Sequence, residues 1–185
     1  MAVFEIAYKR TGINEGGYSN NVNDRGAETY KGISRRAWPN WMGWKHIDDA
    51  KSSNTFPELL ESDVVLQQTI VPEFYQQNYW AKIKATEIQS QEVANELYDS
   101  AVNFGDFNAI MMLQRSLNLL NKNERLWPDL LLDGKMGAAT LEATNKANSS
   151  ALLKSLNGFQ FMKYALICEH DPSQEIFYLG WLNRI

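Results

Sequence analysis

The chain has 185 residues, of which 44% are hydrophobic and 22% charged, a composition typical of a folded globular protein and not of a disordered one. Its net charge of −4 argues against a nucleic-acid binder, because such proteins usually carry a basic patch. The single cysteine, Cys168, excludes an intrachain disulfide and a four-cysteine metal site, and no apolar run is long enough for a transmembrane helix.

The N-terminal segment predicts a short helix that ends near Gly16 and Gly17. Its apolar residues recur near helical spacing at Val3, Phe4, Ala7 and Tyr8. Glu15 would then lie in the last turn or just past it, where the helix dipole disfavours a negative charge. Such a position favours the protonated carboxyl that a general acid needs.

The next stretch, residues 18–33, is dense in Asn, Asp and Gly and predicts a loop or small hairpin. After it, Ser34 could cap a helix that reaches Met42 and is shortened by Pro39. Residues 45–57 are polar and predict a loop. Residues 59–80 have a helical pattern that we expect Pro72 to split into two pieces.

The second half of the chain predicts further helices. Ser90 precedes an apolar stripe over 93–102, and a second amphipathic pattern covers 107–121. A polar connection over 122–134 leads to three more helical patterns, at 140–147, 152–169 and 176–182. The predicted fold is mainly α, with a small hairpin or turn-rich flap near residues 18–33.

Two carboxylates and a threonine lie close together in the sequence of the N-terminal third. Glu15 precedes two glycines, Asp24 follows nine residues later and Thr29 five residues beyond that. Glycoside hydrolysis usually needs two carboxyl groups that flank one bond. Glu15 could act as the general acid, while Asp24 could orient a water molecule or offset oxocarbenium charge. The alternative for Asp24 is a turn aspartate that caps its own backbone.

The motifs around these residues resemble the signature of the glycoside hydrolase family 108 muramidases, which are phage- and bacterium-encoded lysozymes that cut peptidoglycan. The motifs are Glu15-Gly16-Gly17-Tyr18, Asn23-Asp24-Arg25-Gly26, Glu28-Thr29 and Lys31-Gly32-Ile33. The resemblance implies a lysozyme-like helical domain, a catalytic Glu15 and no cofactor. It implies hydrolysis of the β-1,4 bond between N-acetylmuramic acid and N-acetylglucosamine.

The spacing of Glu15, Asp24 and Thr29 also resembles that of phage lysozymes with a glutamate, an aspartate and a threonine in the site. By that resemblance, Thr29 and Asp24 would hold the attacking water. Glu28 is the competitor of Thr29, and it would point to the opposite face if residues 28–30 form a strand. Candidate sugar contacts, each with a structural role as the alternative, are Tyr18, Asn20, Tyr30 and Asn103.

The C-terminal part resembles the region of this family that is often described as a peptidoglycan-binding domain. The residues that carry this resemblance are Asp99 to Gly105, Leu113 to Asn118, Leu132 to Gly137 and Gly180 to Arg184. We therefore expect a catalytic lobe over 1–106 and a helical, peptidoglycan-binding-like lobe over 107–185. The expected partner is the glycan strand of peptidoglycan.

The N-terminus has Glu5 inside its apolar part and its basic residues after it, which is the reverse of a signal peptide. We therefore expect synthesis in the cytoplasm, and action on the cell wall after release or export by another system.

Other functions remain as alternatives. His46 lies near Asp48 and Asp49, but no HExxH or similar spacing accompanies it, so a solvated loop is favoured over a zinc amidase site. A non-catalytic peptidoglycan-binding or secretion-assisting protein could keep the same fold. A lytic transglycosylase would use one acid and no water, and would leave a 1,6-anhydro sugar.

Overall fold

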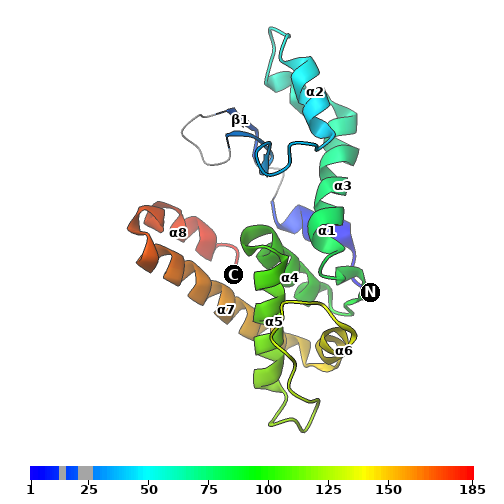
Figure 1. The fold of residues 1–185 in the computed structure, drawn as a ribbon, viewed down its shortest axis with the longest axis vertical. Coiled ribbons are helices and arrows are strands. Elements are labelled where there is room, and N and C mark those ends of the chain that lie inside the picture. The colour runs from blue at the N-terminus through cyan, green and yellow to red at the C-terminus, as the bar shows by residue number, and fades with distance from the viewer. Residues whose placement is uncertain (13–15, 21–26) are drawn as a thin grey trace. The chain divides into compact units, whose positions relative to one another are not determined.

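The computed structural model describes residues 1–12, 16–20 and 27–185, and it confirms a mainly α protein with one small antiparallel sheet (Figure 1). The chain divides into two compact units. The first, here called the helical unit, comprises Met1–Thr11 and Tyr79–Ile185. The second, here called the sheet unit, comprises Gly12–Asn78.

The helical unit is organised around helix α4 (Gln91–Phe104), which packs against α1 (Phe4–Arg10), α5 (Asp106–Leu120) and α7 (Ser149–His170). Its remaining elements are the short turn η5 (Ala85–Glu87), α6 (Ala138–Lys146), η6 (Pro172–Gln174) and α8 (Glu175–Leu182). The predicted cap of α4 is confirmed, because the Ser90 side chain accepts a hydrogen bond from the Val93 amide. Every residue of α4 from Val93 to Ala101 is buried, so this helix forms the centre of the core.

The sheet unit begins with the strands β1 (Tyr18–Asn20), β2 (Glu28–Tyr30) and β3 (Ile33–Ser34), which pair antiparallel in that order. Helix α2 (Gly43–Ala50) and the 3-10 turn η2 (Glu58–Ser62) follow. A longer helical segment contains a π-type turn η3 (Leu66–Ile70), α3 (Val71–Tyr75) and a second π-type turn η4 (Gln76–Trp80), whose end crosses into the helical unit along the chain.

Two predictions for residues 34–57 are wrong. Residues 35–42 form successive turns after β3 instead of a helix, and the first helix after the sheet is α2, which overlaps the stretch expected to be a loop. Pro39 lacks an amide hydrogen and keeps Trp38 away from helical geometry. The Trp44 indole also donates to the Trp38 carbonyl at 2.7 Å, which fixes the turn.

Pro72 does not split the helix that contains it. The chain stays helical from Leu66 to Trp80, with the two π-type turns on either side of α3. A π-type turn widens the helix, and this relieves the contact between a proline ring and the preceding turn. Within the residues that the structure describes, no helix combines the length and apolar character that crossing a bilayer requires.

Candidate functional site

The two carboxylates predicted to act, Glu15 and Asp24, lie outside the described residues. The structure does describe what precedes them. Helix α1 ends at Arg10, so the prediction that it runs to Gly16 is wrong. Because a helix dipole acts only within the last turn, it gives no support to a raised pKa at Glu15.

The register of the sheet places Thr29 on one face of β2. Thr29 pairs with Ser19 of β1 and with Ser34 of β3, and directly opposite residues of an antiparallel pair share a face. Three hydroxyl groups therefore stand in a row across the sheet. The Thr29 hydroxyl is half-buried and bonds to none of the residues that the structure describes.

The other face of the same sheet carries Tyr18, Asn20, Glu28 and Tyr30, since Tyr18 pairs with Tyr30 and Asn20 with Glu28. The expectation that Glu28 and Thr29 point to opposite faces of a strand is thus confirmed. Two of the predicted sugar contacts, Tyr18 and Asn20, consequently gather with Glu28 and not with Thr29.

Glu28 is held by a network of charges. Its carboxylate lies 2.5 Å from Arg35 Nε and 2.7 Å from Lys51 Nζ, and it accepts a hydrogen bond from the Tyr18 hydroxyl at 3.0 Å. Arg35 also donates two hydrogen bonds to Asp48, at 3.0 and 2.7 Å. This arrangement ties β2 to helix α2 inside the sheet unit.

The network sets the charge state of Glu28. Burial opposes the charge, but the hydrogen bonds from Lys51 and Tyr18, together with the surrounding positive charges, outweigh it and lower the pKa of Glu28. A general acid needs a raised pKa so that it holds a proton near neutral pH. Glu28 is therefore suited to anchoring the sheet and not to donating a proton.

Sequence reasoning missed the partners of Glu28, because Arg35 was assigned to a helix that starts after Ser34, and Asp48 and Lys51 were assigned to a polar loop. A signal for α2 was present. The apolar Trp44 and Ile47 lie three residues apart, and the charges of Lys45 and Asp49 stand one turn apart, where they form an ion pair at 2.6 Å.

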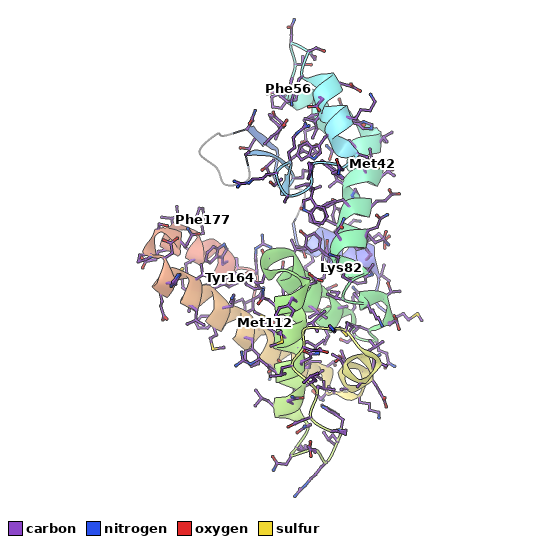
Figure 2. All side chains as sticks on the ribbon, in the orientation of Figure 1. Met42, Phe56, Lys82, Met112, Tyr164 and Phe177 are labelled. Carbon is purple, nitrogen blue, oxygen red and sulfur yellow. The ribbon has the colours of Figure 1, made fainter. Side chains whose placement is uncertain are left out.

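The Tyr18 side chain lies on the face of the sheet that carries Glu28 and packs there. Its ring meets Phe56, labelled in Figure 2, in an edge-on contact with 4.6 Å between ring centroids. Burial, followed by the hydrogen bond to Glu28, raises the pKa of the Tyr18 hydroxyl, so it remains a neutral donor. Asn20 at the end of β1 is exposed and can reach a ligand.

The last two predicted sugar contacts have different surroundings. Tyr30 is 0% exposed and its hydroxyl accepts a hydrogen bond from Gln67 at 2.5 Å, so its ring fills the core of the sheet unit and presents no surface to a sugar. Asn103 belongs to the helical unit. Its amide donates at 2.8 Å both to the Asp99 carbonyl and to the Asp99 carboxylate on the preceding turn of α4.

His46 also differs from its prediction. It lies on α2 and not in a loop, and its Nδ1 is 2.7 Å from the Asp63 carboxylate. Across residues 1–12, 16–20 and 27–185, no group of three or more His, Cys, Asp or Glu side chains is placed to hold a metal ion.

The comparisons with known proteins agree with the sequence motifs. The family model described as glycosyl hydrolase 108 matches residues 8–105, and the model described as a predicted peptidoglycan domain matches residues 108–185. The solved structure of SagA from Brucella abortus aligns with a TM-score of 0.62 at 23% identity, covering 98% of this chain and 88% of that one. At this identity the likeness shows a common, lysozyme-like fold and nothing further. No curated protein matches the chain. Because the first of these models covers more than half of the sequence, the chain belongs to the glycosyl hydrolase 108 family.

Proposed function

We propose that this protein is a muramidase that hydrolyses the β-1,4 bond between N-acetylmuramic acid and N-acetylglucosamine in peptidoglycan. The observation that carries the proposal is the Glu15-Gly16-Gly17-Tyr18 motif within the region that matches the glycosyl hydrolase 108 family. The match of residues 108–185 to a peptidoglycan domain supports the choice of substrate.

In the proposed reaction, Glu15 protonates the glycosidic oxygen as the bond breaks. Thr29, with Asp24, holds the water that attacks the sugar. The Thr29 hydroxyl lies on its own face of the sheet without a bond to another described residue, and this supports the role. Glu28, the alternative to Thr29, is engaged with Arg35, Lys51 and Tyr18, and these contacts favour Thr29 as the residue that holds the water. Asn20, exposed at the end of β1, remains a proposed sugar contact, whereas Tyr18, Tyr30 and Asn103 are better explained by the hydrogen bonds that they make inside their own units.

The decisive experiment is digestion of purified peptidoglycan by the wild-type chain and by Glu15→Gln, with mass analysis of the released ends. We expect reducing N-acetylmuramic acid ends from the wild type and a rate lower by about 10²–10⁴-fold from the variant, which is the usual contribution of a general acid. Equal rates in both proteins would overturn the role of Glu15.

The same digestion separates the two rival functions. Anhydro ends would identify a lytic transglycosylase. An intact wall after incubation with folded wild-type protein, combined with sedimentation of the protein with the wall, would identify a non-catalytic peptidoglycan-binding protein.

A further inference from the structure

The sheet unit contains a pocket that the proposed reaction does not use. Its volume is about 490 Å³, within the range of about 300–1,000 Å³ typical of small-molecule sites. One wall is the turn segment 37–42. The other is a single face of the helical segment, formed by positions 70, 73, 74, 77 and 78, which recur at helical spacing.

The floor of this pocket is aromatic and rigid. Trp38 and Trp41 meet the Phe74 ring edge-on, with centroid distances of 4.9 and 5.9 Å. The Trp41 ring lies so close to Gly43 that a Cβ there would come within 2.3 Å of it. The Trp44 indole fixes the Trp38 carbonyl. The aromatic surface is therefore held in place before any ligand arrives.

The rim of the pocket is polar. The exposed side chains of Asn40, Glu73 and Gln77 surround the floor, and Glu73 and Gln77 stand one helical turn apart. Met42, 64% exposed and labelled in Figure 2, closes another side. The rim thus offers amide donors and acceptors and one carboxylate above an apolar floor.

The charge of the pocket lining favours neutral ligands over anionic ones. The lining residues, all within the described part of the chain, include no Lys, Arg or His to balance Glu73. An anionic ligand would meet an unbalanced carboxylate, whereas a neutral ligand with one apolar face and several hydroxyl or amide groups matches both floor and rim. Of the two sugars of a peptidoglycan strand, N-acetylglucosamine is neutral, whereas N-acetylmuramic acid carries a lactyl group that ends either in a free carboxylate or in an acidic peptide stem.

We propose that this pocket is a binding site for an N-acetylglucosamine unit, stacked on Trp38 and Trp41 and hydrogen-bonded by Gln77 and Asn40. The choice of sugar rests on the proposed function, because that function supplies the glycan strand. The pocket would hold a strand to the protein through a contact that takes no part in bond cleavage.

The test uses the full chain with Glu15→Gln, so that no ligand is consumed, and titrates it with the trimer of N-acetylglucosamine. The indole N–H resonances of Trp38 and Trp41 are followed by ¹H–¹⁵N NMR. Gln77→Ala is compared with Gln76→Ala, since both glutamines are exposed neighbours on one helix and only Gln77 lines the pocket.

We expect the trimer to shift both indole resonances, and Gln77→Ala to weaken the affinity measured there by about three- to tenfold, as the loss of a neutral hydrogen bond implies. Gln76→Ala should bind as the parent does. Unmoved Trp38 and Trp41 resonances, or equal affinities of the two variants, would overturn the proposal.

A second variant tests the selectivity. Glu73→Gln should raise the affinity for the disaccharide that contains N-acetylmuramic acid more than the affinity for the neutral trimer. An equal change for both ligands would contradict the charge argument. The two proposals fail separately: active enzyme with unmoved indoles overturns the pocket alone, and inactive enzyme with shifted indoles overturns hydrolysis alone.

Discussion

Thr29 is the described residue on which the proposed reaction can be tested most sharply. Its methyl group stays the same in Thr29→Val while its hydroxyl is lost, and valine is well accommodated in a strand. We expect the rate of peptidoglycan hydrolysis to fall on the order of 10²-fold, because the attacking water loses a hydrogen bond partner. Thr29→Ser should restore most of the rate.

The matched control for this change is Ser19→Ala, on the same face of the sheet and directly opposite Thr29. It removes a hydroxyl that the proposed mechanism does not use, so the rate should stay within about twofold of the wild type. A loss in Ser19→Ala equal to that in Thr29→Val, with both proteins folded by circular dichroism, would show that the row of hydroxyls acts only in packing.

Glu96 on helix α4 is a buried carboxyl whose protonation should govern stability. It is 6% exposed, and burial, followed by the charge of Asp99, raises its pKa from 4.5 to about 7. The folded state therefore favours the neutral form. Below pH 4.5 Glu96 is protonated whether the chain is folded or not, and above about pH 7 the folded protein must carry a buried charge. Stability should thus fall as the pH rises from 4.5 to 7.

The size of this effect follows from the shift in pKa. The raised pKa of Glu96 makes the free energy of unfolding lower at high pH than at low pH by about 3 kcal/mol. Glu96→Gln should therefore raise the free energy of unfolding at pH 8 by about 2–3 kcal/mol and change it little at pH 4, measured by urea unfolding. Glu92→Gln is the control, since that side chain is 58% exposed on the same helix. A less stable Glu96→Gln at pH 8 would contradict the argument.

At the scale of elements, the side chain of one glutamine in α5 joins this helix to the loop at residues 133–135. Gln114 of α5 is 1% exposed, and its amide nitrogen donates to Asp133 Oδ1 at 2.8 Å and to the Lys135 carbonyl at 3.1 Å. Its carbonyl accepts from the Gly134 amide at 3.0 Å. Gly134 has a positive φ of 65°, and the Phe107 ring occupies the space that a Cβ would need. Two motifs that look separate in the sequence are thus halves of one contact.

This contact predicts a stability effect. Gln114→Leu keeps the volume of the side chain but leaves the loop amide of Gly134 buried without its partner. We expect the free energy of unfolding to fall by about 2–4 kcal/mol, measured by chemical denaturation. Leu119→Gln, at a position 74% exposed on the same helix, should change it by less than about 0.5 kcal/mol. Comparable losses in the two variants would show that the hydrogen bonds of Gln114 to residues 133–135 do not stabilise the region.

The helices show which elements a sequence can predict. Helix α4 was predicted because Ser90 marks its start and one long apolar stripe follows, so cap and periodicity agree. Helix α2 was missed because its exposed face is charged and its apolar face is short. The pairing of Ser19, Thr29 and Ser34 could not be predicted either, since register depends on contacts between strands and a shift of one residue exchanges the two faces.

At the scale of the whole molecule, the compact units do not follow the two family matches. Helix α4 lies within the match to glycosyl hydrolase 108, but it packs against α5 and α7 of the region that matches the peptidoglycan domain. Near the C-terminus, Arg184 pairs at 3.0 Å with the Asp99 carboxylate of α4 and approaches the Thr11 carbonyl at 3.4 Å. The expected catalytic lobe over 1–106 therefore shares a core with residues beyond it.

This shared core predicts the outcome of cutting the chain after residue 106. The fragment 1–106 would expose the apolar face of α4 and leave Asp99 without Arg184, and an exposed apolar face of that kind promotes aggregation. We expect the fragment to be insoluble, or to lack a cooperative thermal transition when it is kept in solution. Supplying residues 107–185 as a separate chain during refolding should restore solubility, because it restores the partners of α4. A fragment 1–106 that is soluble, cooperatively folded and active on peptidoglycan would show that residues 107–185 are dispensable for the fold and would leave wall binding as their role.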